Sequence, residues 1–198
     1  MRRLAGLMAR VLILGGLGLA ALAGCARITA VDPGPVAIGA GLHIRGEVGW
    51  NRLPPGALGA DQAWTRDGSD LDTLLFVAGR SEGQPLLTHK RERKALLLHA
   101  GVTPTEVMEL WGTELALAGH CMVRTDRLMP AAFASSPGFG FHFAYANRAG
   151  LPFEGYAAGA MVGQKLYLIA FAAARAHQFP AYWPAASVLI GSANIVRD

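Results

Sequence analysis

The residue best placed for chemistry is Cys25, a thiol that directly follows an apolar segment near the start of the chain. Residues 11–23 are thirteen residues without a charged or polar side chain, and Arg2, Arg3 and Arg10 precede them without an acidic neighbour. This length is typical of the apolar region of a signal peptide and is well short of the ~20 residues that a membrane-spanning helix needs. The sequence therefore predicts an export signal that ends at a thiol.

The four residues around this thiol, Leu22-Ala23-Gly24-Cys25, resemble a lipobox, the cleavage and lipidation signal of bacterial lipoproteins. The resemblance implies that the signal peptide 1–24 is cut off between Gly24 and Cys25, and that Cys25 then carries lipid, usually three acyl chains of the palmitate kind. Small side chains before the cut let the peptidase approach the bond. Each buried methylene contributes ~0.8 kcal/mol, so several chains together anchor a protein stably to a membrane. A plain secretory signal and an uncleaved helix are the alternatives.

The residue after the thiol is Ala26 and not the aspartate that resembles an inner-membrane retention signal. The resemblance to lipoproteins therefore implies a location on the periplasmic face of the outer membrane. The first residues, MRRLA, match a twin-arginine signal poorly, and this favours export by the general secretory route.

No other residues are spaced for a recognised reaction or metal site. The sequence has no HExxH, CxxC, GxSxG or GxxxxGK[ST] motif, and no two histidines form an i,i+4 pair on a predicted helix. We therefore expect no metal and no cofactor, and we favour a protein that is not an enzyme. The histidines are His43, His89, His99, His120, His142 and His177.

Cys121 is the second cysteine of the chain, and we expect it to be a buried, inert thiol. Its neighbour His120 would point to the opposite face of a strand, whereas a Cys–His nucleophile pair must face each other. A meeting of Cys121 with His142 across the sheet is the alternative. With Cys25 lipidated, the mature chain has no partner for an internal disulfide, so packing must hold the fold.

Two charged segments have simple interpretations. Asp67-Gly68 in the segment DGSDLD predicts a hairpin turn, because a calcium loop would need a glycine where Asp72 stands. The basic run His89–Lys94 is most simply a solvated loop, with anionic lipid headgroups or an acidic partner as the alternative.

The charge of the mature chain argues against nucleic acid as a partner. The whole chain has a net charge of +4, but residues 1–24 hold three of the 18 basic residues and none of the 14 acidic ones, so the mature chain has +1. Its 174 remaining residues suit one domain with a proper core. Residues 25–41, with Pro33, Pro35 and several glycines, predict a flexible tether before a single globular domain over 42–198.

The elements that must hold any site begin with strands. Alternation over 42–50 predicts a strand, and 64–66 and 71–77 predict a hairpin across Asp67-Gly68. Thr103-Pro104-Thr105-Glu106 combines a Thr N-cap, a Pro at the first helical position and a Glu at the third, which predicts a helix to about Gly119. Four further strands follow, and then a second helix. The strands are predicted over 122–128, 139–145, 153–161 and 165–174, the first as an edge or exposed strand and the last as a central buried strand. The helix is predicted over 182–194.

This order predicts an α+β domain with an antiparallel sheet of about six strands and two main helices packed on it. The order is similar to the PsbP-like fold, shared by an extrinsic photosystem subunit, a Ran-binding protein and bacterial envelope proteins. The local carriers of this resemblance are Trp64-Thr65-Arg66-Asp67-Gly68, Pro137-Gly138-Phe139 and Leu166-Tyr167-Leu168-Ile169. The chain also resembles small proteobacterial lipoproteins, which imply no activity.

These observations favour an envelope lipoprotein that binds another envelope protein or supports assembly. Its partners would be the membrane, through the lipid on Cys25, and an envelope protein. Two alternatives stay open, namely an enzyme or metal-dependent protein whose site forms only in the fold, and a binder of a small hydrophobic ligand behind Phe139, Phe141 and Phe143. Trp50, Trp64, Phe179, Tyr182 and Trp183 are candidates for a binding surface, but we expect most of them to belong to the core.

Overall fold

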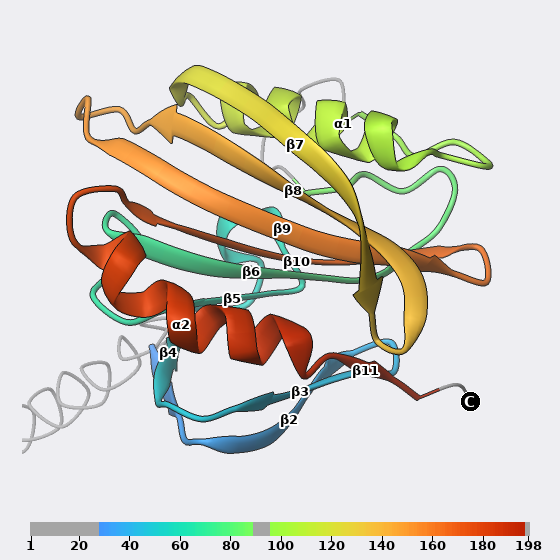
Figure 1. The fold of residues 1–198 in the computed structure, drawn as a ribbon, viewed down its shortest axis with the longest axis horizontal. Coiled ribbons are helices and arrows are strands. Elements are labelled where there is room, and N and C mark those ends of the chain that lie inside the picture. The colour runs from blue at the N-terminus through green and yellow to red at the C-terminus, as the bar shows by residue number, and fades with distance from the viewer. Residues whose placement is uncertain (1–27, 89–95, 197–198) are drawn as a thin grey trace, which may run out of the picture.

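The structure is a computed structural model that describes residues 28–88 and 96–196 (Figure 1). The predicted signal peptide, Gly24, Cys25 and the basic run His89–Lys94 lie outside the described residues. The elements are β1 (Thr29–Val31), β2 (Gly34–Gly39), β3 (Leu42–Gly46), β4 (Trp50–Arg52), a 3₁₀ turn η1 (Ala57–Gly59), β5 (Gln62–Thr65), β6 (Asp72–Arg80), α1 (Pro104–Leu117), β7 (Cys121–Phe133), β8 (Ser136–Ala146), β9 (Pro152–Val162), β10 (Lys165–Ala174), α2 (Gln178–Gly191) and β11 (Asn194–Ile195).

Eight of the described strands form one antiparallel sheet in the order β1-β4-β5-β6-β10-β9-β8-β7. This confirms the predicted α+β class with an antiparallel sheet and two helices, but the prediction of about six strands is wrong. The two strands β1 and β4 have three residues each, too few for an alternating pattern to be visible in a sequence. Strand β10 is central and buried over almost its whole length, as predicted.

A second, three-stranded sheet has the order β11-β3-β2. The segment before residue 42 was expected to be a flexible tether, but β1 of the large sheet and β2 of the small sheet occupy most of it. Pro33 falls between the two strands, and Pro35 lies in β2, which pairs with β3 alone. A proline is compatible with such an edge strand, since its missing N–H can face away from the ladder.

The large sheet separates two hydrophobic cores, because successive strand residues point to opposite faces. On β6, Leu75 and Val77 pack with α1, whereas Leu74 and Phe76 pack with α2 and the small sheet. Figure 1 shows the result as layers, with α1 on one side of the curved sheet and α2 on the other, between the large sheet and β2–β3. The four aromatic residues of β8 face α1 as their alternation predicts. These are Phe139, Phe141, Phe143 and Tyr145.

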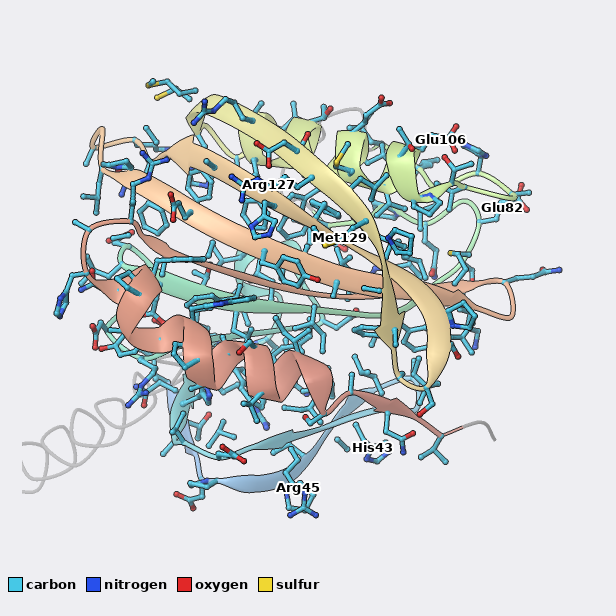
Figure 2. All side chains as sticks on the ribbon, viewed as in Figure 1. His43, Arg45, Glu82, Glu106, Arg127 and Met129 are labelled. Carbon is cyan, nitrogen blue, oxygen red and sulfur yellow. The ribbon has the colours of Figure 1, made fainter. Side chains whose placement is uncertain are left out.

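Helix α1 begins with the capping box that the sequence predicts. The Thr103 hydroxyl oxygen accepts a hydrogen bond from the Glu106 N–H, and the Glu106 carboxylate accepts one from the Thr103 N–H at 2.8 Å. Figure 2 shows Glu106 at this end of the helix. Helix α2 spans 178–191 and not 182–194, because Pro180 stands in its first turn, where a missing N–H costs no helical bond.

Strand β7 forms one edge of the large sheet, as the sequence suggests for this segment, but it is longer than predicted. Its pairing with β8 is interrupted between Cys121 and Arg124 and again between Asp126 and Met129. Arg127, labelled in Figure 2, has a φ of +53°, a value rare for a residue with a side chain. These bulges twist the edge and make it a poor template for another strand.

Candidate functional site

The main cavity among the described residues lies between α1 and the large sheet and has a volume of about 720 Å³. Sites for small molecules have volumes of ~300–1,000 Å³ and mostly apolar walls. Here the apolar walls are made by Leu75, Leu87, Trp111, Leu115 and Phe143, all of them buried. The cavity is therefore large enough and apolar enough to hold a small molecule.

The cavity exists because the sheet beneath it carries small side chains. Ala170 and Ala172 of β10 line it, and their partners across the ladder are Leu75 and Thr73 of β6. Larger residues at these two alanine positions would reach into the space between sheet and helix, because alternate residues of a strand stand on the same face. The opposite wall comes from α1, where Trp111, Leu115 and others share one face of the helix.

Two buried polar atoms at this cavity have no hydrogen-bond partner within the described part of the chain. They are the indole Nε1 of Trp111 and the Nδ1 of His120. Leaving such a buried group without a partner costs ~1–3 kcal/mol, so native structures seldom keep one without a reason. A bound molecule with an oxygen near these atoms would remove that cost.

Burial shifts the pKa values of two ionisable groups of the cavity, His120 and Tyr145. Burial, and to a smaller degree the nearby Arg148, lowers the pKa of His120, so the imidazole is neutral at neutral pH. Burial raises the pKa of Tyr145 far above its ordinary value, so its phenol stays protonated. The two rings are in contact, with centroids 4.2 Å apart. Both side chains therefore offer neutral hydrogen-bonding groups and no charge.

The mouth of the cavity is made by exposed residues from three turns. Leu58 follows β4, Ser69 and Asp70 belong to the turn between β5 and β6, and Arg148 follows β8. The Arg148 Nη2 donates a hydrogen bond of 2.7 Å to the Ala118 carbonyl, so a cation caps the C-terminal end of α1. The polar groups thus gather at the mouth, whereas the deeper walls are mainly apolar.

Three acidic or histidine side chains line the cavity, namely Asp70, Glu114 and His120. Glu114 is 1% exposed, and among the described residues it is the buried wall residue with an ionisable carboxyl group. Within residues 28–88 and 96–196, no three His, Cys, Asp or Glu side chains are grouped so that they could hold a metal ion.

A Cys–His nucleophile pair, which the sequence left open as an alternative, does not form. Cys121 is exposed and not buried as expected, because it begins the edge strand β7. It lies opposite Ala146, whereas His142 lies opposite Asp126 and packs on Tyr156 at a ring distance of 5.2 Å. The alternative of a Cys121–His142 meeting is therefore wrong.

The acidic turn is structural, as predicted. Asp72 is buried and its carboxylate accepts hydrogen bonds from the N–H groups of Arg66 at 2.7 Å and Asp67 at 2.8 Å. The Thr65 hydroxyl donates a third bond to it at 3.2 Å. These bonds close the hairpin between β5 and β6 and position Ser69 and Asp70 at the mouth of the cavity.

The aromatic residues suggested for an exposed binding surface are mostly packed. Trp50 and Trp64 are 3% and 0% exposed and belong to the core on the α2 side. Phe179 and Trp183 are half-buried and stacked on each other at 5.7 Å. The Arg66 guanidinium lies 4.6 Å above the Tyr182 ring, so this ring is also engaged.

A cavity behind the aromatic row of β8 was left open as an alternative from the sequence, and the cavity is lined by Phe143 of that row, but its other lining residues were not identified from the sequence. One signal was available, because Glu114 falls on the apolar face of α1 between Trp111 and Leu115. A carboxylate on a core-facing helical position is unusual and marks a place with polar surroundings. The small residues of β10 gave no signal by themselves, since a buried strand of alanines also fits ordinary packing.

None of the helices in the described part of the chain is long and apolar enough to cross a membrane.

Fold and cavity together define a layered α+β domain with a ligand-sized space between a helix and an antiparallel sheet. No protein-family model and no curated protein sequence matches the chain. Among solved structures, it is similar to cyanobacterial PsbP (CyanoP) from Synechocystis sp. PCC 6803, with 12% identity, a TM-score of 0.49, and coverage of 91% of this chain and 99% of that chain. It is also similar to LpqN of Mycobacterium tuberculosis, described as involved in cell envelope biogenesis, with 11% identity, a TM-score of 0.42, and coverage of 86% and 91%. At TM-scores below 0.5, neither similarity supports a conclusion about function.

Proposed function

We propose that this chain is a lipid-anchored domain of the bacterial cell envelope that binds a small, mainly apolar molecule between α1 and the large sheet. The observation that carries the binding function is the cavity of about 720 Å³ with apolar walls and a few polar atoms. The anchor is supported by the sequence Leu22-Ala23-Gly24-Cys25 at the end of the apolar segment.

The walls and the polar atoms have different roles in this binding. Apolar contact with Trp111, Leu115 and Phe143 supplies most of the affinity, at ~25 cal/mol per Å² of apolar surface removed from water. The unpartnered Nε1 of Trp111 is a donor, so it selects a ligand with an oxygen acceptor. The Nδ1 of the neutral His120 can donate or accept, depending on its tautomer.

Binding is tested with the neutral fluorescent probe N-phenyl-1-naphthylamine and two alanine substitutions. Ala172→Leu adds atoms that occupy the cavity, whereas Ala144→Leu adds the same atoms on the opposite face of the sheet, where Ala144 is half-exposed. We expect probe binding to weaken at least ~10-fold in Ala172→Leu, which corresponds to 1.4 kcal/mol, and to stay unchanged in Ala144→Leu. Equal binding by the two variants would show that the probe is held elsewhere.

The anchor is tested by comparing the full precursor with its Cys25→Ala variant in bacterial cells. We expect the native chain to lose residues 1–24, gain the mass of acyl chains and sediment with membranes, and the variant to do none of these. Intact mass spectrometry and membrane fractionation give the two readouts. A soluble, unacylated native protein would refute the anchor and leave the cavity as a site in a freely diffusing domain.

A further inference from the structure

The cavity mouth is linked through β4 and the turn after β5 to β1, the strand that begins the described domain. Strand β1 pairs with β4, and Ala30 stands opposite Asn51. The segment directly after β4 contributes Leu58 to the mouth, and the turn directly after β5 contributes Ser69. The Asn51 side chain also donates a hydrogen bond of 3.2 Å to the carbonyl of Arg66, which starts that turn. Strand β1 itself lines no part of the cavity, but its partner β4 leads to the rim residue Leu58 and bonds to the turn that carries Ser69.

The length of chain before β1 limits how far the domain can move from a lipid on Cys25. Four peptide units separate Cys25 from Thr29, and a fully extended chain of this length spans at most ~14 Å. This is much shorter than the width of the domain, since β9 alone has 11 residues and rises ~3.3 Å per residue. A lipid on Cys25 would thus hold β1 close to the bilayer surface, and with it the rim that is linked to β1 through β4.

Exposed apolar side chains occur on the rim of the cavity, beside β1, and two residues from the cavity wall. Leu58, on the rim, is 48% exposed, and Ile28, next to β1, is 60% exposed. Met122 is 81% exposed and stands two residues after His120 of the cavity wall. Apolar side chains beside a cation suit the boundary between acyl chains and headgroups, and Arg148 supplies the cation at this rim. Other exposed apolar side chains lie away from the mouth: Leu97, Met129, Val188 and Val196.

Backbone strain marks two of these side chains. Leu58 and Met122 have φ values of +54° and +53°, in the left-handed region that residues other than Gly, Asn and Asp seldom adopt. Such strain persists only where the surrounding structure holds it, and strained residues cluster at functional sites. The fold thus holds two large, exposed apolar side chains in strained backbone positions, one on the rim of the cavity and one two residues from its wall.

We propose that the cavity mouth faces the bilayer and that the ligand is an amphipathic lipid that enters the cavity from it. This inference rests on the proposed function, because it needs both the anchor and the cavity. The acyl chain packs against the apolar walls, and the polar head stays near Arg148 and the neutral His120 at the mouth.

The orientation is tested with single labels on the lipidated chain. In a Cys121→Ser background, the exposed thiol is absent and the Cys25 sulfur is occupied by lipid, so an introduced cysteine takes up one nitrobenzoxadiazole label. Ser69→Cys places the label at the mouth, and Gln164→Cys places it in the turn between β9 and β10, at the other end of these strands. The probe is a vesicle of phosphatidylethanolamine and phosphatidylglycerol that contains a lipid with a nitroxide headgroup.

We expect nitroxide quenching to be several-fold stronger for the label at position 69 than for the label at position 164. Equal quenching, or stronger quenching at 164, overturns the inference and leaves the cavity binding intact, because probe binding to the unlabelled protein is measured separately. An unacylated protein would stay in solution and carry a second label on Cys25. That result refutes the anchor and overturns this inference with it.

Entry of lipid is tested by one methionine substitution with a matched control. Met122→Asn removes the exposed apolar side chain and places at this position a residue that tolerates a positive φ, so folding is not harmed. Met129→Asn is the control on the same strand, 40% exposed and labelled in Figure 2. We expect Met122→Asn to slow extraction of pyrene-labelled phosphatidylglycerol from the same vesicles several-fold, and Met129→Asn to leave it unchanged. Equal rates for both variants, or no extraction by the native protein, overturn the lipid ligand.

Discussion

The close contact between Gly155 and Phe143 predicts that one added methyl group destabilises the domain. Gly155 of β9 stands opposite Phe143 of β8, and the Phe143 ring lies directly over it. An alanine Cβ at position 155 would come too close to three atoms of this ring, the most distant of them at 2.8 Å. Gly155 has no positive φ, so the effect of Gly155→Ala comes from this contact and not from backbone strain.

The ring has little room to move. Phe143 is 3% exposed and packs edge-on against Trp111 of α1, with ring centroids 5.5 Å apart. Overpacking of this kind costs about 1–3 kcal/mol, and the smaller entropy of the unfolded chain offsets about 0.4–1 kcal/mol of it. We therefore expect Gly155→Ala to lower the free energy of unfolding by about 1–2 kcal/mol, and the melting temperature by ~2–4 °C for each kcal/mol.

Urea denaturation of the chain from residue 26 onwards measures this change. Gly191→Ala is the control, because position 191 ends α2, has no positive φ and has nothing within 4 Å of an added Cβ. The free energy of unfolding of this control should rise by about 0.4–1 kcal/mol, so the two Gly→Ala substitutions should change stability in opposite directions. A double variant with Phe143→Leu should recover part of the loss, since the two residues are in contact. If Gly155→Ala is as stable as the native chain, the packing argument is wrong.

Three further predictions concern α1 and the ionisable groups. Thr103→Ala removes the N-cap of α1 and should cost about 1 kcal/mol in urea denaturation, with Thr103→Ser restoring most of it. The pKa of His99 is raised by its bond to the Ala100 carbonyl and by Glu106. At pH values below the ordinary pKa near 6.5, His99→Ala should therefore lower the free energy of unfolding, and this effect should disappear as pH rises through the raised pKa. A stability difference independent of pH would contradict this account. Burial raises the pKa of Tyr145, so the free energy of unfolding should fall as pH rises beyond the ordinary value of 10. The stability of Tyr145→Phe should fall less over the same range. Thermal unfolding at alkaline pH measures the difference.

The elements that the sequence predicted best are those held by local interactions. The capping box at Thr103 lies within four residues of chain, and the alternation on β8 is complete within seven, so each is visible without knowledge of the rest. The hairpin at Asp67-Gly68 is equally local, and Asp72 adds bonds that the turn pair already favours.

The strands before residue 42 could not be predicted in the same way. Strand β1 is stabilised by β4, and β2 is stabilised by β3, so their own composition matters less than the neighbours they find. A proline-containing segment is compatible with a tether and with an edge strand, and the sequence alone does not distinguish them. The exposure of Cys121 depends similarly on the edge position of β7, which follows from the order of all eight strands.

The full set of residues that line the candidate site could not be predicted from the sequence, for a different reason. Its walls combine α1, β6, β8, β10 and the turn after β4, which are far apart along the chain. A cavity is a place where side chains fail to fill the space, and this depends on the distance between helix and sheet. Sequence patterns indicate which face of an element is buried, but they do not give that distance.

The small sheet has a consequence for the order in which the chain can fold. Strand β3 is completed by β11, and the Ser192 hydroxyl group exchanges hydrogen bonds with the Arg45 N–H at 2.8 Å and the Arg45 carbonyl at 3.0 Å, across 147 residues of sequence. The Val196 N–H adds a bond to the Gly41 carbonyl. Contacts so distant in sequence form slowly and only after both partners have left the ribosome. Strand β3 can pair with β2 early, but it gains its second partner only when the last residues are present, so the small sheet is completed last.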